Sequence, residues 1–185
     1  MSEWFETLDG LHAQAWAELA NGVVDADHPC RLASFSTLSI DGWPEARFVV
    51  VRQANAEAGM VEVQSDLRSS KFTSLRKTPK AALVWWVPAV DLQIRMQADV
   101  EISEGPALDE AWAKVPPSSR VSYGTQPPPG TPIANALDYD KTPDRAAFAA
   151  LRCHISTIDL VHLGAQHRRA GYTRARDWQG QWLSP

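Results

Sequence analysis

The alternation of apolar and polar residues from Leu92 to Ile102 is the feature that most constrains how this chain folds. Successive side chains of a β-strand point to opposite faces of a sheet, so the pattern predicts a strand with one face turned to a core. The other face must meet solvent, a ligand or a second subunit. It carries Gln93, Arg95, Gln97, Asp99 and Glu101. The pattern therefore requires a sheet with one buried face.

A hairpin is predicted upstream of this strand. Residues Arg31–Ile40 form a strand with imperfect alternation, in which we expect a bulge near Ser36-Thr37. Asp41-Gly42 is typical of a two-residue hairpin turn, and Trp43–Arg52 forms the returning strand. The continuous run FVVV within the returning strand predicts burial on both of its faces.

Other strand-like stretches complete the sheet. They are Met60–Ser65, Lys80–Val87, Ile155–Leu163 and the basic segment that starts at His167. Together the stretches give at least six strands in hairpin and meander order, with helices at the start, middle and end of the chain. This order fits a mainly β fold, a closed or partly closed antiparallel β-barrel with peripheral helices, better than a doubly wound α/β sheet.

The first helix is predicted over residues 2–21. Ser2 would cap it, Asn21-Gly22 would end it, and apolar residues recur at helical spacing between them. His12 lies within this apolar stripe, so we interpret it as a structural histidine rather than a catalytic one.

The segment from about 105 to 153 is predicted to be a helical and proline-rich insertion. A helix starts it, and a second helix after Thr142-Pro143 carries Phe148 and Leu151. Between the helices, Pro116–Pro132 is too rich in proline for a central strand and too long for a plain connector. We expect an ordered arm near the functional site. A lid, a disordered segment and a polyproline ligand for a small recognition domain are the alternatives.

The whole chain, residues 1–185, is predicted to be a single domain. A chain of this length buries a substantial core of its own. The N-terminal helix precedes a barrel that is built from about residues 30–103 and 154–185, and the insertion separates the two parts of the barrel.

Charge and cysteine content exclude several classes of protein. The formal charge of −4 argues against a nucleic-acid binder, which normally presents a basic surface. Cys30 and Cys153 stand far apart and without metal-ligand spacing, so we expect free thiols, no metal site and a cytoplasmic location. We find neither a signal peptide nor an apolar run of the roughly 20 residues that a membrane span needs, so no membrane association is expected.

Cationic and hydroxyl side chains gather between Arg47 and Lys71. A short helix that begins at Ser69 or Ser70 would direct its free backbone N–H groups, and the positive end of its dipole, at an anion. With Arg47 and Lys71 beside that helix, phosphate is the natural ligand. A solvated basic loop with an ordinary serine cap is the alternative.

Strand geometry separates the two arginines of RFVVVR. Arg47, Val49 and Val51 share one face of the strand, and Arg52 points to the other face unless the strand bulges or ends. We therefore expect Arg47 and Arg52 to serve different parts of one site, or one of them to be a surface residue.

The order of these elements resembles that of the pyridoxamine 5′-phosphate oxidase-like, FMN-binding split-barrel proteins. The resemblance rests on RFVVVR, on QSDLRSSK before a helix ending KTP, on KAALVWW followed by DLQIRMQADVE, and on a terminal W…WLSP. It covers residues 31–101 well and the C-terminal part loosely. It implies an FMN-binding split β-barrel, a homodimer with the flavin at the subunit interface, and a small-molecule substrate.

The resemblance also implies which residues hold the cofactor. Arg47 would contact the FMN phosphate, as would Lys71, while Ser70 departs from the basic residue that the family has beside that lysine. Gln93 stands where the family has a flavin-contacting glutamine, commonly from the second subunit. The implied cofactor-binding residues are Arg47, Val49, Val50, Val51, Arg52, Ser65, Asp66, Ser70, Lys71, Gln93, Gln126 and Arg169.

The substrate end departs further from the family pattern. True pyridoxamine phosphate oxidases have a lysine where this chain has Arg52, and the guanidinium keeps the charge but changes the geometry. They also carry an Arg-x-His near the C terminus, where this chain reads HRRAGY, and a flavin-packing tryptophan at the position of Val161.

The resemblance therefore implies an FMN-dependent oxidoreductase of the broader FMN-binding branch, which transfers a hydride between flavin and a small substrate. No catalytic dyad stands out in the sequence, as expected where the flavin supplies the chemistry. The same fold with a deazaflavin or another cofactor, and a flavin-binding sensor without turnover, are the alternatives.

Overall fold

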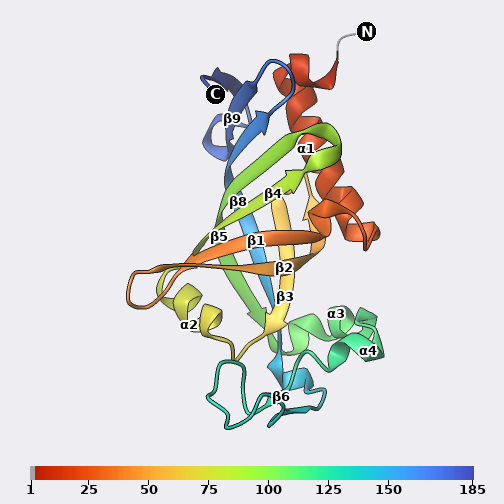
Figure 1. Ribbon diagram of the computed structural model, residues 1–185, viewed down its shortest axis with the longest axis vertical. Coiled ribbons are helices and arrows are strands. Elements are labelled where there is room, and N and C mark those ends of the chain that lie inside the picture. Colours follow the sequence, from red (N-terminus) through yellow and green to blue (C-terminus); the bar gives the residue numbers. More distant parts are fainter. Residues whose placement is uncertain (1–2) are drawn as a thin grey trace.

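Six antiparallel strands form a closed barrel in the computed structural model, which describes residues 3–185 (Figure 1). They are β1 (Leu32–Leu38), β2 (Pro44–Asn55), β3 (Met60–Asp66), β4 (Lys80–Val87), β5 (Leu92–Glu104) and β8 (Phe148–His162). Their order around the barrel is β8-β3-β2-β1-β4-β5, and the pairing of β5 with β8 closes it. The expected antiparallel barrel with peripheral helices is confirmed.

Apolar side chains from every strand fill the barrel. On β5 the apolar residues from Leu92 to Val100 face the core, as their alternation predicts. Phe35 of β1, Leu83 of β4 and Ile158 of β8 belong to the same cluster and are almost fully buried. Each large apolar side chain buried in this way contributes roughly 1.5–3 kcal/mol, so this cluster is a main source of stability.

Two helices cover the barrel. Helix α1 (Leu8–Val24) lies along one side and buries Leu11 and Leu19, while α2 (Ser70–Lys77) lies towards the other end and buries Phe72 (Figure 1). None of the helices within residues 3–185 combines the length and the apolar character that a membrane crossing requires.

The C-terminal strands lie beside the start of α1 at one end of the barrel (Figure 1). Strand β9 (Arg168–Thr173) pairs with β8, and β10 (Gly180–Leu183) pairs with β9. The Tyr172 hydroxyl donates a hydrogen bond of 2.7 Å to the Leu8 carbonyl at the start of α1. The C-terminal strands therefore fasten α1 to the barrel.

The start of the first helix differs from the prediction. The expected cap, Ser2, lies outside the described residues. A 3-10 turn, Trp4–Glu6, comes first, and the Thr7 hydroxyl then caps α1 by accepting a hydrogen bond of 3.0 Å from the Gly10 N–H.

The end of that helix also differs, because α1 runs through Asn21-Gly22 to Val24. Gly22 is the point where the helix packs against the backbone near Cys30. A Cβ atom at Gly22 would lie 2.4 Å from the Cys30 carbonyl carbon, which is closer than atoms can approach. The glycine therefore serves close packing and not helix termination.

The first hairpin corrects three expectations. Pairing of β1 with β2 is regular from Leu32 to Leu38, so there is no bulge at Ser36-Thr37. The turn is longer than two residues, because the Gly42 N–H donates to the Ser39 carbonyl and Gly42 has a φ of +85°. Burial of FVVV on both faces is also wrong, since Phe48 is 75% exposed.

The insertion contains less helix than predicted. It holds two short helices, two short strands and two 3-10 turns: α3 (Asp109–Lys114), α4 (Pro117–Arg120), β6 (Thr125–Gln126), β7 (Asp140–Lys141), Gly105–Leu108 and Arg145–Ala147. The predicted helix with Phe148 and Leu151 is wrong, because these residues begin β8, where they pair with both β3 and β5. A short apolar run has no period that distinguishes a buried strand from a buried helix.

We predict that Gly22→Ala destabilises the protein by about 1–3 kcal/mol, because its Cβ would collide with backbone that cannot move without repacking α1. Alanine favours an isolated helix by about 1 kcal/mol over glycine, so helix propensity alone predicts the opposite sign. Urea unfolding measures the difference, and Asn21→Ala on the exposed face of α1 is the matched control. Equal stability of Gly22→Ala and the wild type would contradict the packing role.

Candidate functional site

The residues between Arg47 and Lys71 surround a cavity of about 380 Å³, which we call the corner cavity. Its walls come from β2, from the end of β3, from the start of α2 and from the proline-rich arm, which we define as residues 116–132. Seven of the residues predicted at the site line this cavity. They are Arg47, Val49, Val50, Arg52, Ser65, Asp66 and Lys71.

Five other predicted residues do not line the corner cavity. The Val51 side chain is fully buried in the core, and Ser70 points to solvent from the first turn of α2. Gln126 is exposed on the arm. Gln93 and Arg169 belong to β5 and β9, neither of which is next to β2 in the barrel.

Three of the four C-terminal arginines have partners away from the corner cavity. Arg169 donates two hydrogen bonds to Asp159, of 3.1 and 2.7 Å. The Arg168 guanidinium lies 4.7 Å from the centre of the Phe5 ring, and Arg174 donates to backbone carbonyls that include that of Gly59. None of these three arginines lines the corner cavity of the described chain.

Lys71 is a cation without a counter-anion among residues 3–185. Its ammonium donates hydrogen bonds to the hydroxyls of Ser65, at 2.9 Å, and Ser69, at 2.7 Å, and both are neutral. Burial lowers the pKa of Lys71, and the nearby charge of Arg47 lowers it further, against a smaller opposing effect of Asp66. An anion that enters the cavity would relieve both unfavourable effects.

Two other basic side chains of this corner already have anionic partners. Arg47 forms an ion pair of 2.8 Å with Glu45 and donates to the Thr37 hydroxyl at 2.7 Å. Arg68 forms an ion pair of 2.6 Å with Asp66. Among the described residues that line the corner cavity, the unpaired positive charge is therefore carried by Lys71 and Arg52.

Asp66 is the most constrained acid of the site. Its carboxylate accepts hydrogen bonds from the backbone and side chain of Arg68 and from the Gly124 N–H. Burial by itself would raise the pKa of Asp66, but these hydrogen bonds outweigh it and hold the pKa below its usual range. The Asp66 side chain is thus committed to contacts within the protein.

A bulge in β2 determines where Arg52 points. Val51 pairs with Val63 and Gln53 with Glu62, which leaves Arg52 as the extra residue. Bulges commonly redirect a side chain near a functional site. Here Arg52 lines both the corner cavity and a second cavity beside it.

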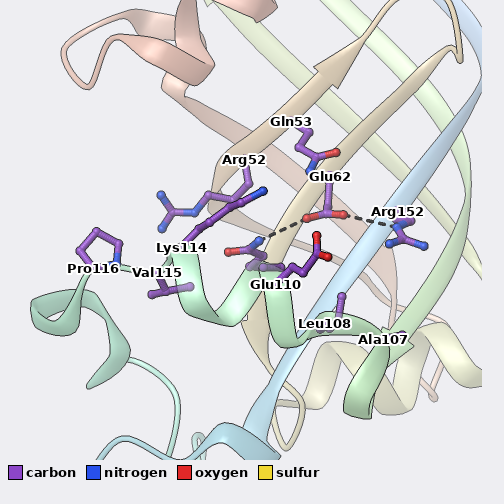
Figure 2. A pocket seen from close by; sticks show the side chains of 12 residues that line it. Arg52, Gln53, Glu62, Ala107, Leu108, Glu110, Lys114, Val115, Pro116 and Arg152 are labelled. Carbon is purple, nitrogen blue, oxygen red and sulfur yellow. Dashed lines mark hydrogen bonds and ion pairs between the residues drawn. The ribbon is translucent and has the colours of Figure 1, made fainter.

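The second cavity, which we call the side cavity, lies between α3 and strands β2 and β3 and has a volume of about 310 Å³ (Figure 2). Its floor is Glu62, which is 2% exposed, pairs with Arg152 at 3.4 Å and accepts a hydrogen bond from Gln64. Figure 2 shows Arg52 and Lys114 together at one end of this cavity. Among the described residues neither cation has a hydrogen-bond or ion-pair partner.

Sequence reasoning did not assign half of the residues that line the corner cavity. The missed lining residues are Phe48, Gln64, Ser69, Ser119, Ser122, Tyr123 and Pro129. Phe48 and Gln64 adjoin predicted residues on β2 and β3. Ser69 belongs to the hydroxyl cluster between Arg47 and Lys71 but was not assigned to the cofactor, so local spacing could have found these three. The four other residues lie within the proline-rich arm, which was expected near the site, but no local pattern shows which of its residues line the cavity.

Comparison with known proteins finds relatives that match between about half and two thirds of the chain. Residues 13–104 match the family model described as pyridoxamine 5′-phosphate oxidase, FMN-binding domain. Pyridoxine/pyridoxamine 5′-phosphate oxidase 2 of Arabidopsis thaliana is 26% identical over 134 residues, which cover 66% of this chain and 67% of the plant protein. A Thermosynechococcus vestitus pyridoxine/pyridoxamine 5′-phosphate oxidase is 32% identical over 87 residues, or 47% of this chain and 40% of its own.

Two solved structures share the fold. A pyridoxamine 5′-phosphate oxidase-related, FMN-binding protein of Nostoc punctiforme has a TM-score of 0.77 at 22% identity and covers 93% of this chain and 96% of its own. PhzG of Burkholderia lata, solved in complex with tetrahydrophenazine-1-carboxylic acid, has a TM-score of 0.71 at 18% identity, with coverage of 94% and 90%.

We predict that Lys71→Met leaves the ligand-free protein at least as stable as the wild type. The wild-type chain must keep a charge that burial and Arg47 both disfavour, and the variant does not. Because the folded-state pKa is lowered, the unfolded chain binds the proton more tightly, so the advantage of the variant should fade as pH rises towards the ordinary lysine pKa.

The same variant should lose its response to anions. Inorganic phosphate should raise the melting temperature of the wild type, because it binds the folded state, but should raise that of Lys71→Met much less. Ser70→Ala, an exposed neighbour, is the matched control and should behave as the wild type. A Lys71→Met protein that is strongly destabilised yet still protected by phosphate would contradict this interpretation.

Proposed function

Because this chain belongs, through residues 13–104, to the pyridoxamine 5′-phosphate oxidase FMN-binding family and takes FMN as its cofactor, we propose that it is an FMN-dependent oxidoreductase. It transfers a hydride between the flavin and a small substrate. The observation that carries the proposal is the uncompensated charge of Lys71 in a cavity large enough for the phosphate end of the cofactor.

The donors around Lys71 suit a phosphate group. The Lys71 ammonium, the Ser65 hydroxyl and the first backbone N–H groups of α2 would hold the phosphate oxygens, since charge-assisted bonds from such donors are the strong ones. The Ser69 hydroxyl donates to the Asp66 carbonyl at 2.8 Å and helps to position the Lys71 ammonium. Arg47 would add long-range attraction while it stays paired with Glu45. The backbone from Val49 to Val51 would run beside the flavin ring.

FMN, when bound, supplies the hydride chemistry, while the protein contributes binding, orientation and exclusion of water. The polypeptide therefore needs no nucleophile or general base of its own for the hydride step. In this scheme the corner cavity fixes one end of the cofactor. The exposed Phe48 ring and the buried Tyr123 ring provide apolar surface on two sides of the same cavity.

The side cavity is the proposed substrate pocket. It shares Arg52 and Gln64 with the corner cavity, so a molecule in it would lie next to the cofactor. The unpaired cations Arg52 and Lys114 favour a small anionic substrate. The names of similar proteins agree with this class, since they act on pyridoxine or pyridoxamine 5′-phosphate, or bind tetrahydrophenazine-1-carboxylic acid.

A homodimer is part of the proposal. The outward faces of β2, β1 and β4 form one apolar surface, in which Phe48, Leu32 and Trp86 are between 44% and 75% exposed. This surface ends at Gln93, which pairs with Trp86 across β4 and β5. A second copy that covers this surface would bury the apolar side chains and could bring Gln93 and Arg169 to the flavin of its neighbour.

The absorbance spectrum of the purified protein, together with its mass in solution, tests the proposal. We expect a flavin spectrum, either at once or after addition of FMN, on a dimer. Anaerobic addition of a reduced pyridine nucleotide or of pyridoxamine 5′-phosphate should then bleach the flavin. Protein that stays colourless with FMN would contradict the proposal, and a flavin that no reductant bleaches would favour a binding module without turnover.

The substrate pocket generates a separate prediction. Arg52→Gln and Lys114→Gln should each weaken the binding of an anionic probe, such as benzoate or inorganic phosphate, by about tenfold, because each removes one charge-assisted contact. Perturbation of the flavin absorbance reports this binding. Lys80→Gln makes the same charge change on an exposed ion pair away from both cavities and is the matched control. Equal affinity in all three variants would contradict the assignment of the pocket.

A further inference from the structure

The carboxylate of Asp66 connects two segments that are far apart in the sequence. Asp66 is 5% exposed and accepts three hydrogen bonds from Arg68, with lengths of 2.9 Å from the backbone and 3.0 and 2.6 Å from the side chain. It accepts a fourth, of 3.1 Å, from the N–H of Gly124, which lies 58 residues further along the chain. The junction of β3 and α2 is therefore bonded directly to the proline-rich arm.

Arg68 strengthens the same connection. Its guanidinium bonds Asp66 and also donates a hydrogen bond of 3.0 Å to the Thr125 carbonyl. Two successive residues of the arm, Gly124 and Thr125, are thus held by one acid and one base. We call this four-residue unit the clamp. The clamp is neutral as a whole, because the two charges offset each other.

The clamp joins two walls of the corner cavity. Ser65, immediately before Asp66, is on the wall that carries Lys71. Ser122 and Tyr123, immediately before Gly124, line the arm side, and Pro129 lines it beyond the clamp. Any change in the distance between Asp66 and Gly124 must therefore change the width of the cavity.

The backbone at Gly124 admits only glycine. Its φ is +120°, a region that side chains rarely allow. A Cβ atom there would lie 2.1 Å from the Thr142 carbonyl oxygen and 2.7 Å from the Asp144 backbone nitrogen. Gly124 can therefore pack against Thr142 and Asp144 only because it has no side chain.

We propose that Asp66 and Arg68 are positioning residues that hold the arm closed over the bound FMN, and that they control the rate at which the cofactor leaves. The inference rests on the proposed function and assigns Asp66 a role other than direct contact with the flavin. In this proposal the arm moves away from β2 and α2 when the cavity opens, and the hydrogen bonds of the clamp hold it in the closed position. Residues 130–143, beyond the clamp, are all exposed, and Asp140–Lys141 in this segment pair with Thr125–Gln126 of the arm.

The test measures FMN dissociation in Asp66→Asn. The holoprotein is diluted into excess apoprotein of a tight flavin binder, and the return of free-flavin fluorescence is followed. We expect dissociation at least tenfold faster than in the wild type, with a much smaller change in the association rate. Gly22→Ala, which weakens the fold far from the cavity, is the control and should leave dissociation unchanged.

Limited trypsin digestion gives a readout that does not involve FMN. Cleavage after Arg120, within the arm, should be faster in Asp66→Asn than in Gly22→Ala, with or without flavin. If Asp66→Asn does not fold, the double variant Asp66→Asn/Arg68→Met removes both charges of the clamp and leaves none unpaired. The same two outcomes are expected of it.

The outcomes separate the two proposals. Wild-type protein that does not bind FMN would overturn the proposed function, and unchanged arm cleavage would then overturn the clamp as well. Wild-type protein that binds FMN, with clamp variants that release flavin and are cleaved no faster than Gly22→Ala, would overturn the clamp alone. Faster release together with faster cleavage supports it.

Discussion

Closure of the barrel by β8 is the constraint on which the remaining structure depends. This strand pairs with β3 on one edge and with β5 on the other, and its C-terminal residues, Thr157–His162, also pair with β9. Because both edges of the sheet are joined, the six barrel strands leave no open edge. The insertion between β5 and β8 must then leave and re-enter the barrel next to the end of β3, and this return brings the arm beside α2. The corner cavity is a consequence of that closure.

The arrangement of charge in the corner gives each basic residue a different task. Arg47 is tied to Glu45 and Arg68 to Asp66, so both are fixed in place and largely neutralised. Lys71 forms hydrogen bonds only to hydroxyl groups. Its charged form is therefore destabilised by burial, which lowers its pKa. A site that binds an anion needs such a residue, because a cation already paired in the empty protein gains little from the ligand.

How much the sequence predicts depends on how local each interaction is. The alternation in β5 and the order of the other strand-like stretches are patterns from which the barrel follows. The cluster between Arg47 and Lys71 marks Arg47, Arg52, Ser65 and Lys71, while Val49, Val50 and Asp66 follow from the family resemblance. Phe148 and Leu151 were assigned to a helix because their apolar run has no period, and only pairing with β3 and β5 determines that it is a strand. The sequence suggested that Gly22 ends the first helix. Its actual role depends on a tertiary contact with Cys30, which local sequence does not show. The link from Asp66 to Gly124 crosses 58 residues and leaves no trace in local spacing.

The bulge at Arg52 places one guanidinium on the wall shared by the two cavities. A single charge that faces two compartments makes their occupancies thermodynamically linked. An anion in either cavity lowers the positive potential felt in the other, and linkage requires that each ligand change the affinity of the other by the same factor. A tightly held anion on one side would thus promote release of an anion from the other. Through one extra residue in a strand, two adjoining pockets form a single coupled system.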